Sequence, residues 1–294
     1  MISGKTRVLG IIGHPVEHTS SPAMHNAAIA ALGLEYVYTA FPVRPEELGP
    51  AIAGMRALNF RGLNVTVPHK VGVMALLDEI SPEARAIGAV NTIDHREGRL
   101  IGHNTDAYGV MQSLRLDGGL ETLPSRVALL GAGGAARAIL YALLQRPEVE
   151  HIALLNRTAE KAAALAASLD PEGKRVQPGV LDASSGEQVA AAGLLINSTS
   201  IGMHPHPDAS PLPNPACLHT GMVVLDIVYN PLETLLLRQA RQAGARPVDG
   251  LGMLARQGAR AFAIWTGVEP PVEVMRAAAL ERLGKPSPLK PAAN

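Results

Sequence analysis

The chain has 294 residues, enough for one large domain or two domains of ordinary size. Lysine and arginine together number 26, as do aspartate and glutamate, so the formal net charge is zero. This balance gives no support for nucleic acid or an anionic membrane as a partner. Cys217 is the single cysteine, so no disulfide forms within the chain. No apolar run approaches the ~20 residues of a membrane span, and we expect a cytoplasmic protein.

Strand-like apolar runs alternate with helical patterns along the first third of the chain. This alternation is typical of an α/β fold with a mostly parallel sheet. The expected strands are 7–12, 36–41 and 62–67, followed by a hairpin of 89–94 and 99–102. The expected helices are 21–32, 45–58, one that begins at Pro68, and one from about 105 to 116.

A second alternation begins near Ser125. Its expected strands are 126–130, 151–155, 175–178, 193–196, 223–228 and 246–248, and helices are expected at 251–266 and 271–283. We expect two α/β domains with a cleft between them. One is an open, mostly parallel-sheet substrate domain of residues 1–106 with 251–294, and the other is a Rossmann-like NADP-binding domain of residues 107–250. Residues 284–294 contain three prolines and indicate a frayed tail.

A glycine-rich run follows the strand at 126–130 and opens a helix. Its residues are Gly131, Ala132, Gly133, Gly134 and Ala135. Such glycines let backbone N–H groups approach a pyrophosphate, and the helix N-terminus adds a favourable dipole. The run alone also occurs in plain turns, so its position between a strand and a helix carries the prediction.

The end of the next strand indicates which cofactor is bound. An acidic residue there would bind the ribose 2′-hydroxyl of NAD, whereas this chain has Asn156, Arg157 and Thr158. An isolated arginine is usually a solvated surface charge, but at this place Arg157 can form paired hydrogen bonds to a 2′-phosphate. The pattern therefore predicts NADP and hydride transfer.

Two residues of the first domain carry the chemistry that a ketone reduction needs. Lys70 is expected in the first turn of the helix at Pro68, where the helix dipole repels a cation, and this favours a function over a solvated surface position. Asp106 is equally able to cap its own helix or to orient Lys70. His14, His18 and His25 have no carboxylate or cysteine at ligand spacing, so no metal site is expected.

Taken together, these motifs resemble the shikimate dehydrogenase family, of the NADP-dependent bacterial type, along essentially the whole chain. Eight motifs occur in the family's order, and together they are far more specific than any one of them. They are 18–22 with 25–26, 64–70, 88–92, 104–106, 131–136, 156–158, 229–231, and 249–254 with Gln257.

The resemblance implies reversible reduction of 3-dehydroshikimate to shikimate with NADPH, a step of chorismate and aromatic amino acid biosynthesis. It implies Lys70 and Asp106 as the catalytic pair. The residues implied to bind substrate are Thr19, Ser21, Thr66, Asn91, Asp106, Tyr229 and Gln257. The residues implied to hold the cofactor are Gly131 to Ala135, Asn156, Arg157, Thr158, Lys161, Ile227, Gly250 and Met253.

Alternatives remain at this point. Thr19 stands where the family usually has serine, and its extra methyl keeps a quinate/shikimate or aminoshikimate dehydrogenase on the same fold as a second hypothesis. A folate-linked methylene dehydrogenase, which shares a lysine-bearing two-domain plan, is less favoured because of the motif at 104–106 and Gln257. A catalytically silent NADPH-binding regulator is less favoured because Lys70, Asp106, Asn91 and Gln257 are all present. Ser21, directly before Pro22, also fits the N-cap of a helix. A homodimer is left open.

Overall fold

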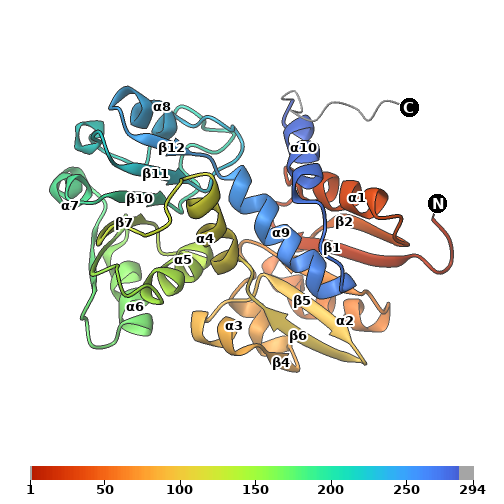
Figure 1. Cartoon of the computed structure of the whole chain (residues 1–294). Helices are drawn as coiled ribbons and strands as arrows, with labels where there is room; N and C mark the ends of the chain where they lie inside the picture. The colour runs from red at the N-terminus through yellow and green to blue at the C-terminus, as the bar shows by residue number, and fades with distance from the viewer. Residues whose placement is uncertain (1, 285–294) are drawn as a thin grey trace. The chain divides into compact units, whose positions relative to one another are not determined.

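The computed structural model describes residues 2–284 (Figure 1). The expected frayed tail therefore lies outside the described residues from position 285 onward. The described chain folds as two compact units. Unit 1 holds the residues up to Asp106 and those from Ala255 onward, and unit 2 is Ala107–Leu254.

Unit 1 is built on a six-stranded sheet in the order β2-β1-β3-β5-β6-β4. The strands are β1 (Arg7–Gly13), β2 (Tyr36–Pro42), β3 (Gly62–Val65), β4 (Glu79–Ile80), β5 (Thr92–Arg96) and β6 (Arg99–His103). Only β5 runs opposite to the others. We call the edge where β1 and β3 end and β5 begins the Lys70 edge, and the opposite edge the Arg61 edge.

Helices cover both faces of this sheet (Figure 1). On one face lie α1 (Ser21–Ala31), α9 (Leu251–Thr266) and α10 (Val272–Arg282), and on the other lie α2 (Leu48–Ala57) and the short α3 (Pro82–Ile87). Gly62 on β3 lets α9 pack closely on the sheet, because a Cβ there would lie 2.1 Å from the Trp265 indole nitrogen. That nitrogen instead donates to the Ile93 carbonyl at 2.9 Å, which fixes α9 on the sheet.

An aromatic cluster buries His25 between α1, β2 and α9. The His25 ring stacks on Tyr38 with centroids 4.2 Å apart, and Phe262 and Trp265 lie around it at 6.1 and 5.6 Å. Among the described residues, neither ring nitrogen has a hydrogen-bond partner. Burial therefore disfavours the charged imidazolium and lowers the pKa of His25 to about 3.

This burial gives a testable pH dependence. Folded His25 stays neutral down to about pH 3, whereas in the unfolded chain it takes up a proton below its ordinary pKa of ~6.5. The unfolding free energy is therefore expected to fall as the pH drops from 6.5 toward 3, by up to about 1.4 kcal/mol per pH unit from this residue. His25→Phe keeps an aromatic ring but removes the titratable imidazole, and with it this pH-dependent contribution to stability.

The check is urea unfolding of wild type and His25→Phe between about pH 7 and about pH 5. The unfolding free energy of the variant is expected to fall less on acidification than that of wild type. Any change in stability that the substitution causes by repacking is the same at every pH and does not affect this comparison. Asp226 in unit 2 acts with the opposite sign, because burial raises its pKa to about 6, but its contribution is common to both proteins. The same pH dependence in both proteins would contradict the assignment to His25.

Unit 2 is built on a six-stranded sheet whose strands are all parallel. They are β7 (Arg126–Leu130), β8 (His151–Asn156), β9 (Val176–Val180), β10 (Leu194–Asn197), β11 (Val223–Asp226) and β12 (Arg246–Val248). The order β12-β11-β10-β7-β8-β9 is the doubly wound order of dinucleotide-binding folds, with its switch point between β7 and β10. Ligands of such sheets bind at that point, beyond the carboxyl ends of the strands.

The helices of unit 2 lie on both faces of its sheet, with α5 (Gly134–Leu144) and α6 (Ala159–Leu169) on one and α7 (Gly186–Ala190) and α8 (Leu235–Gln242) on the other (Figure 1). One buried aliphatic cluster joins β10 and β11 to α8 through Leu195, Val224 and Leu237. Buried aliphatic side chains on every central strand explain the continuous apolar runs of the sequence. The expected fold class, two α/β units with mostly parallel sheets, is confirmed.

The prediction of a helix that begins at Pro68 is wrong. Residues 67–71 form turns, and a 3-10 helix, η2 (Gly72–Leu76), follows them. The backbone has other partners here, because the carbonyl of Lys70 accepts from the Val90 N–H at 2.8 Å rather than from within a helix. The expected helix at 45–58 divides into a 3-10 turn, η1 (Pro45–Glu47), and α2, and β4 and α3 were not expected.

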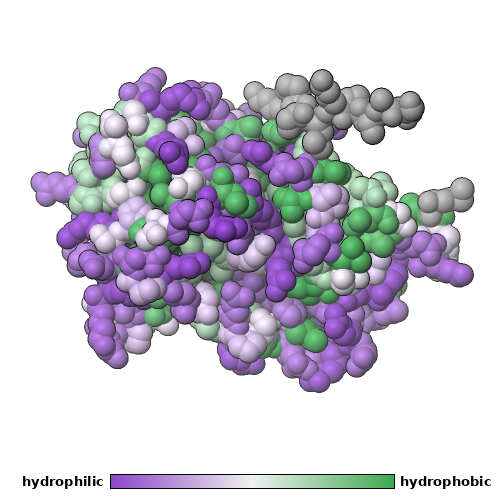
Figure 2. Space-filling view, viewed as in Figure 1, coloured by the Kyte–Doolittle hydropathy of each residue, from purple (hydrophilic) through white to green (hydrophobic). Residues whose placement is uncertain are grey.

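No helix within residues 2–284 is long and apolar enough to cross a membrane. The face of the molecule in Figure 2 is mostly hydrophilic, with hydrophobic residues in small separate patches.

Candidate active site

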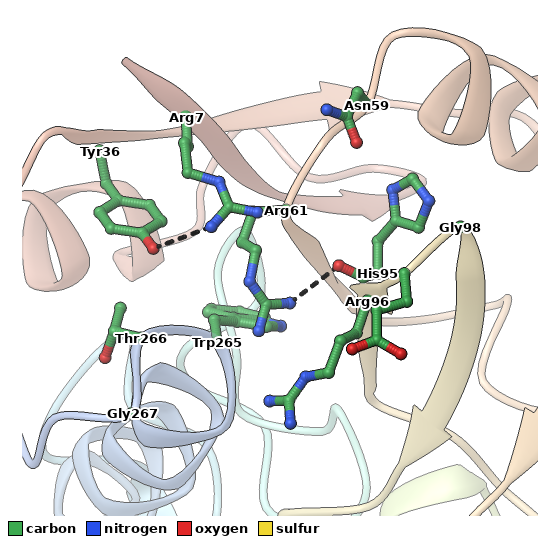
Figure 3. A pocket seen from close by; sticks show the side chains of 11 residues that line it. Arg7, Tyr36, Asn59, Arg61, His95, Arg96, Gly98, Trp265, Thr266 and Gly267 are labelled. Carbon is green, nitrogen blue, oxygen red and sulfur yellow. Dashed lines mark hydrogen bonds between the residues drawn. The ribbon is translucent and has the colours of Figure 1, made fainter. Parts of the chain in front are cut away.

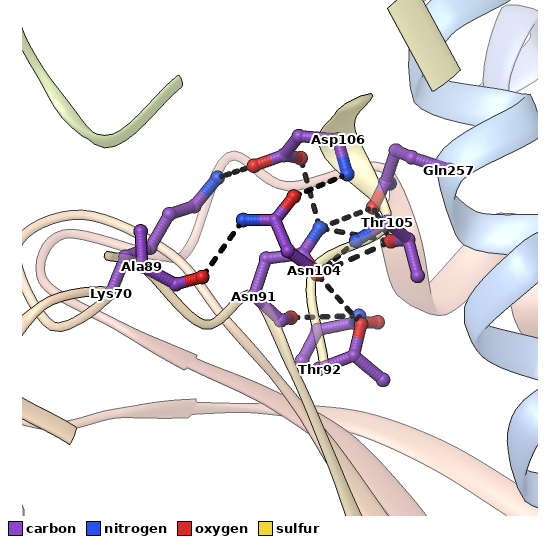
Figure 4. A network of polar contacts seen from close by, with 9 residues as sticks. Lys70, Ala89, Asn91, Thr92, Asn104, Thr105, Asp106 and Gln257 are labelled. Carbon is purple, nitrogen blue, oxygen red and sulfur yellow. Dashed lines mark hydrogen bonds and ion pairs between the residues drawn. The ribbon is translucent and has the colours of Figure 1, made fainter. Parts of the chain in front are cut away.

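A lysine–carboxylate pair lies at the Lys70 edge of unit 1. The Nζ atom of Lys70 donates to Oδ2 of Asp106 at 2.5 Å (Figure 4). Lys70 comes from the turns after β3, and Asp106 is the first residue of α4 (Asp106–Leu116). The Lys70 side chain is 13% exposed and that of Asp106 is 7% exposed, so both are largely withdrawn from water yet remain in reach of a ligand.

The local backbone holds this pair in place. The Lys70 carbonyl accepts from the Val90 N–H, so the turn that carries the ammonium is fixed to the segment before β5. Asn104 donates through Nδ2 to the Ala89 carbonyl at 3.0 Å and accepts the Asp106 N–H on Oδ1 at 3.0 Å. The start of α4 is therefore fixed to the same segment as Lys70.

Asn91 orients the carboxylate from its other side. Its Nδ2 donates to Oδ1 of Asp106 at 2.9 Å, to Oγ1 of Thr105 at 2.9 Å and, more weakly, to Oε1 of Gln257 at 3.3 Å (Figure 4). Its Oδ1 accepts the Thr105 N–H at 2.8 Å. Side chains from Asn91 and Lys70 thus engage both oxygens of Asp106, which favours the orienting role over simple helix capping.

A second layer of polar side chains, formed by Asn64 and Tyr38, holds the Asn91 backbone in place. Asn64 on β3 donates through Nδ2 to the Asn91 carbonyl and to Oγ1 of Thr92, both at 3.1 Å. The Tyr38 hydroxyl donates to Oδ1 of Asn64 at 2.7 Å. Thr105 and this second layer were missed as site residues, although Asn64 and Thr105 both lie inside the two motifs that supplied Lys70 and Asp106.

The other polar groups expected to bind substrate in unit 1 come from the ends of β1 and β3. The Thr19 hydroxyl lies 3.1 Å from the Ser21 hydroxyl and accepts the Ser21 N–H. Ser20 rather than Ser21 is the N-cap of α1, and it makes no side-chain cap bond. Thr66 follows β3 against Gly13, where a Cβ would lie 2.4 Å from the Thr66 methyl.

The glycine run of unit 2 lies at the switch point of its sheet. Gly131 has a φ of +106°, and a Cβ there would approach the Ser198 hydroxyl oxygen to 2.7 Å. Ser198 follows β10 and donates to the Leu130 carbonyl at 2.6 Å, so the two loops are joined just beyond the strands. Gly133 is the N-cap of α5 and is exposed, which leaves this helix N-terminus open to an anion.

The basic segment after β8 lies at the same strand edge as the glycine run. Leu155 of β8 pairs with Leu130 of β7, so the residues that follow each strand are neighbours. Asn156 donates through Nδ2 to the Thr158 carbonyl at 2.8 Å. The remaining members of this segment are exposed, namely Arg157, Thr158 and Lys161.

The other expected cofactor and substrate residues of unit 2 follow β11 and β12. The loops of Ile227 and Gly250 touch, because a Cβ on Gly250 would lie 2.3 Å from the Ile227 carbonyl oxygen. Met253 in α9 is buried, and Tyr229 is half-buried in the loop after β11.

A buried polar cluster below these loops was not predicted. The Asp226 carboxylate accepts from Asn197 at 2.9 Å and from the Thr234 hydroxyl at 2.7 Å. It joins the ends of β10 and β11 and braces the loop that carries Ile227 and Tyr229.

The expected site residues of unit 1 and those of unit 2 are thus each placed within their own unit. Unit 1 brings Lys70, Asp106, Asn91 and Gln257 together, with Thr19, Ser21 and Thr66 on loops at the same edge. Within the described residues, no three histidine, cysteine, aspartate or glutamate side chains gather in a way that would hold a metal ion.

Family models cover most of the chain. Residues 11–93 match the shikimate dehydrogenase substrate binding domain, and residues 250–280 match the shikimate 5′-dehydrogenase C-terminal domain. Between them, residues 127–248 match the saccharopine dehydrogenase NADP binding domain.

Whole-chain similarities agree with these models. A shikimate dehydrogenase (NADP(+)) of Symbiobacterium thermophilum is 50% identical over 96% of this chain and 97% of its own. The crystal structure of shikimate 5-dehydrogenase from Thermus thermophilus in complex with NADP(H) and shikimate has a TM-score of 0.83 at 41% identity, over 94% of this chain and 99% of that chain. Quinate dehydrogenase from Corynebacterium glutamicum in complex with NAD is also similar, with a TM-score of 0.85 at 33% identity over 94% and 99%.

Proposed function

Because the chain belongs to the shikimate dehydrogenase family, we propose that it catalyses the reversible NADPH-dependent reduction of 3-dehydroshikimate to shikimate. It is an NADP-dependent oxidoreductase that acts on a CH–OH group. The observation that carries the substrate assignment is the Lys70–Asp106 pair, oriented by Asn91 in the unit that contains the matched substrate-binding region. The reaction belongs to chorismate and aromatic amino acid biosynthesis.

The proposed division of labour follows the two units. Residues 1–106 with 251–294 form the substrate-binding and catalytic domain, and residues 107–250 form the NADP-binding domain. The residues of unit 2 fit this cofactor, because Gly131 keeps the turn after β7 free of a side chain and Gly133 leaves the α5 N-terminus open. Arg157, Thr158 and Lys161 would hold the 2′-phosphate, with Asn156 bracing their turn.

Lys70 is the proposed acid and base. When bound, NADPH supplies the hydride that reduces the carbonyl carbon. The Lys70 ammonium then donates a proton to the carbonyl oxygen, and in oxidation the neutral amine takes that proton back from the hydroxyl. Asp106 holds the ammonium through Oδ2 and accepts a substrate hydroxyl, while Asn91 keeps the carboxylate turned toward Lys70.

The remaining substrate residues position the ring. Thr19 and Ser21 present adjacent hydroxyls, which suit a carboxylate, and neither side chain caps α1. Thr66, Asn91 and Gln257 are the proposed partners of the ring hydroxyls. Tyr229 is the proposed pocket-lining residue from unit 2, and Ile227, Gly250 and Met253 are the proposed neighbours of the nicotinamide.

Quinate is the substrate to test against shikimate, because Thr19 carries one methyl more than the serine that the family usually has at this position. We expect shikimate to be oxidised with NADP⁺ at least about tenfold more efficiently in kcat/KM than quinate, a difference of ~1.4 kcal/mol. Thr19→Ser is the matched variant, and it removes only that methyl.

The measurement is the initial rate of NADP⁺ reduction by wild type and Thr19→Ser with each substrate. Comparable kcat/KM values for the two substrates in wild type would assign a quinate/shikimate enzyme instead. No turnover with either substrate would contradict the proposed function and favour the silent NADPH-binding regulator.

The small-molecule substrate and NADP are the partners that this proposal requires. The proposed location is the cytoplasm. A homodimer is a separate hypothesis, and sedimentation equilibrium of the purified chain tests it.

A further inference from the structure

A polar pocket opens at the Arg61 edge of unit 1, at the opposite end of the strands from Lys70 (Figure 3). Its volume of about 400 Å³ lies in the range of small-molecule sites. β5 connects the two edges, since Thr92 at its start lies next to Asn91 of the candidate active site and Arg96 at its end lines the pocket. The two sites are therefore separated by roughly 14 Å along this strand, at about 3.4 Å per residue.

Three arginines face this pocket because of the strand directions. Arg7 begins β1, Arg61 directly precedes β3, and Arg96 ends the antiparallel β5. The starts of the parallel strands and the end of β5 meet at one edge, so the three side chains come from separate strands to one place (Figure 3). This convergence depends on the fold, and the sequence spacing alone does not reveal it.

The positive charge at this place is only partly neutralised. Asp94 accepts from Arg61 and lies 3.4 Å from Nε of Arg96, so one carboxylate serves two guanidinium groups. The nearest polar contact of Arg7 is the Tyr36 hydroxyl at 3.5 Å. With Glu97 on the pocket wall, three cationic side chains face two carboxylates.

The pKa of Arg61 is lowered to about 10, mainly by burial and to a smaller extent by the charges of Arg7 and Arg96. A third negative group in the pocket would balance the like charges.

Helix capping explains part of this arrangement but not all of it. Arg61 and Arg96 each donate to the Ile264 carbonyl near the end of α9, at 3.4 Å in both cases. Such contacts are common at helix C-termini. They involve neither Arg7 nor the open volume, and the amide of Asn59 on the wall takes no part in them. Thr266 belongs to the helix end itself, because its hydroxyl donates to the Phe262 carbonyl at 2.8 Å.

We propose that this pocket is a binding site for a small organic anion with a phosphate or carboxylate head group, separate from the substrate and NADP sites. The planar guanidinium groups of Arg7 and Arg96 match the oxygens of either head group. Tyr36 and Asn59 supply a hydroxyl and an amide group for the polar body of the ligand. This inference does not depend on the proposed function.

The test is calorimetric titration of the full chain with glycerol 3-phosphate and, separately, with succinate at constant ionic strength. The protein is first saturated with NADPH and shikimate, a pair that does not react, so that the other anion-binding groups are occupied. The variant is Arg7→Ala/Arg96→Ala, and Arg61 is kept because it is buried and ion-paired. The matched control is Arg44→Ala/Arg85→Ala, which removes two exposed arginines of unit 1 that do not line the pocket.

Wild type and the control are expected to bind one of the probes with equal affinity, and the pocket variant at least about tenfold more weakly. Tighter binding of glycerol 3-phosphate assigns a phosphate head group, and tighter binding of succinate assigns a carboxylate. Arg7→Ala alone perturbs few contacts and is expected to weaken binding several-fold, so the test does not depend on the double variant folding. No binding of either probe to wild type, or equal affinity in both double variants, would overturn the proposal.

Discussion

Lys70→Met is expected to lower kcat for shikimate oxidation by about 10²–10⁴-fold, the usual contribution of a positioned general acid or base. Methionine keeps the length and the apolar stem of lysine but has no proton to give or take. Lys70 is bonded to Asp106 in unit 1, whereas the residues proposed to hold NADPH lie in unit 2. The dissociation constant for NADPH is therefore expected to change by less than about threefold, which is ~0.65 kcal/mol.

Steady-state rates and NADPH binding, measured on the same preparations, separate these two effects. Lys5→Met is the matched control, because Lys5 is an exposed lysine of unit 1 near the N-terminus. It is expected to leave both quantities unchanged. A loss of kcat below about tenfold in Lys70→Met, which is ~1.4 kcal/mol of barrier, would mean that Lys70 is not the acid and base.

Arg157→Ala is expected to weaken NADPH binding by about 10- to 100-fold while NADH binding changes little. A hydrogen bond to a charged group contributes roughly 1.5–3 kcal/mol, and only NADPH carries the 2′-phosphate. Arg157 is exposed in the turn after β8, so its loss is not expected to disturb the core.

Titration of the variant with each nucleotide measures this difference directly. Arg126→Ala is the control, because Arg126 is an exposed arginine of the same unit that begins β7, at the edge opposite the glycine run. Equal losses for NADPH and NADH in Arg157→Ala would show that Arg157 does not contact the 2′-phosphate. The specificity would then have to come from Thr158 or Lys161.

Much of this fold could be predicted from local sequence patterns. The bounds of β7 and β12 and the full length of α9 agree with the predicted ranges. β7 is a short, mostly apolar run between turn residues and α9 is long and amphipathic, so in both places local preference and tertiary packing favour the same structure. β12 consists only of Arg246, Pro247 and Val248 and is not an apolar run.

The segment after β3 could not be predicted in the same way. Pro68 is a good first residue for a helix, but the Lys70 carbonyl is bound by Val90, which is twenty residues further along the chain. Because that helix is absent, the expected repulsion of Lys70 by a helix dipole is also wrong. The ion pair with Asp106 and the low exposure of Lys70 now carry the case for its function.

The candidate site shows a similar limit. The order of the motifs pointed to Lys70, Asp106, Asn91 and Gln257, and the fold places these four residues together. The order of the motifs did not reveal the buried cluster around Asp226, because no local sequence pattern indicates the partners of a carboxylate at the end of a strand. The three arginines of the Arg61 edge were missed for the same reason, since they converge only through strand pairing.

If this chain transfers a hydride between shikimate and NADP, the hydrogen on the oxidised carbon of shikimate passes directly to the cofactor. The most direct test uses shikimate that carries deuterium on the carbon that becomes the ketone, incubated with the purified full chain and NADP⁺. The mass of the NADPH formed is then measured. We predict NADPH that is one mass unit heavier than the unlabelled compound. Unlabelled NADPH would contradict direct hydride transfer from that carbon, and the absence of NADPH would contradict the proposed function.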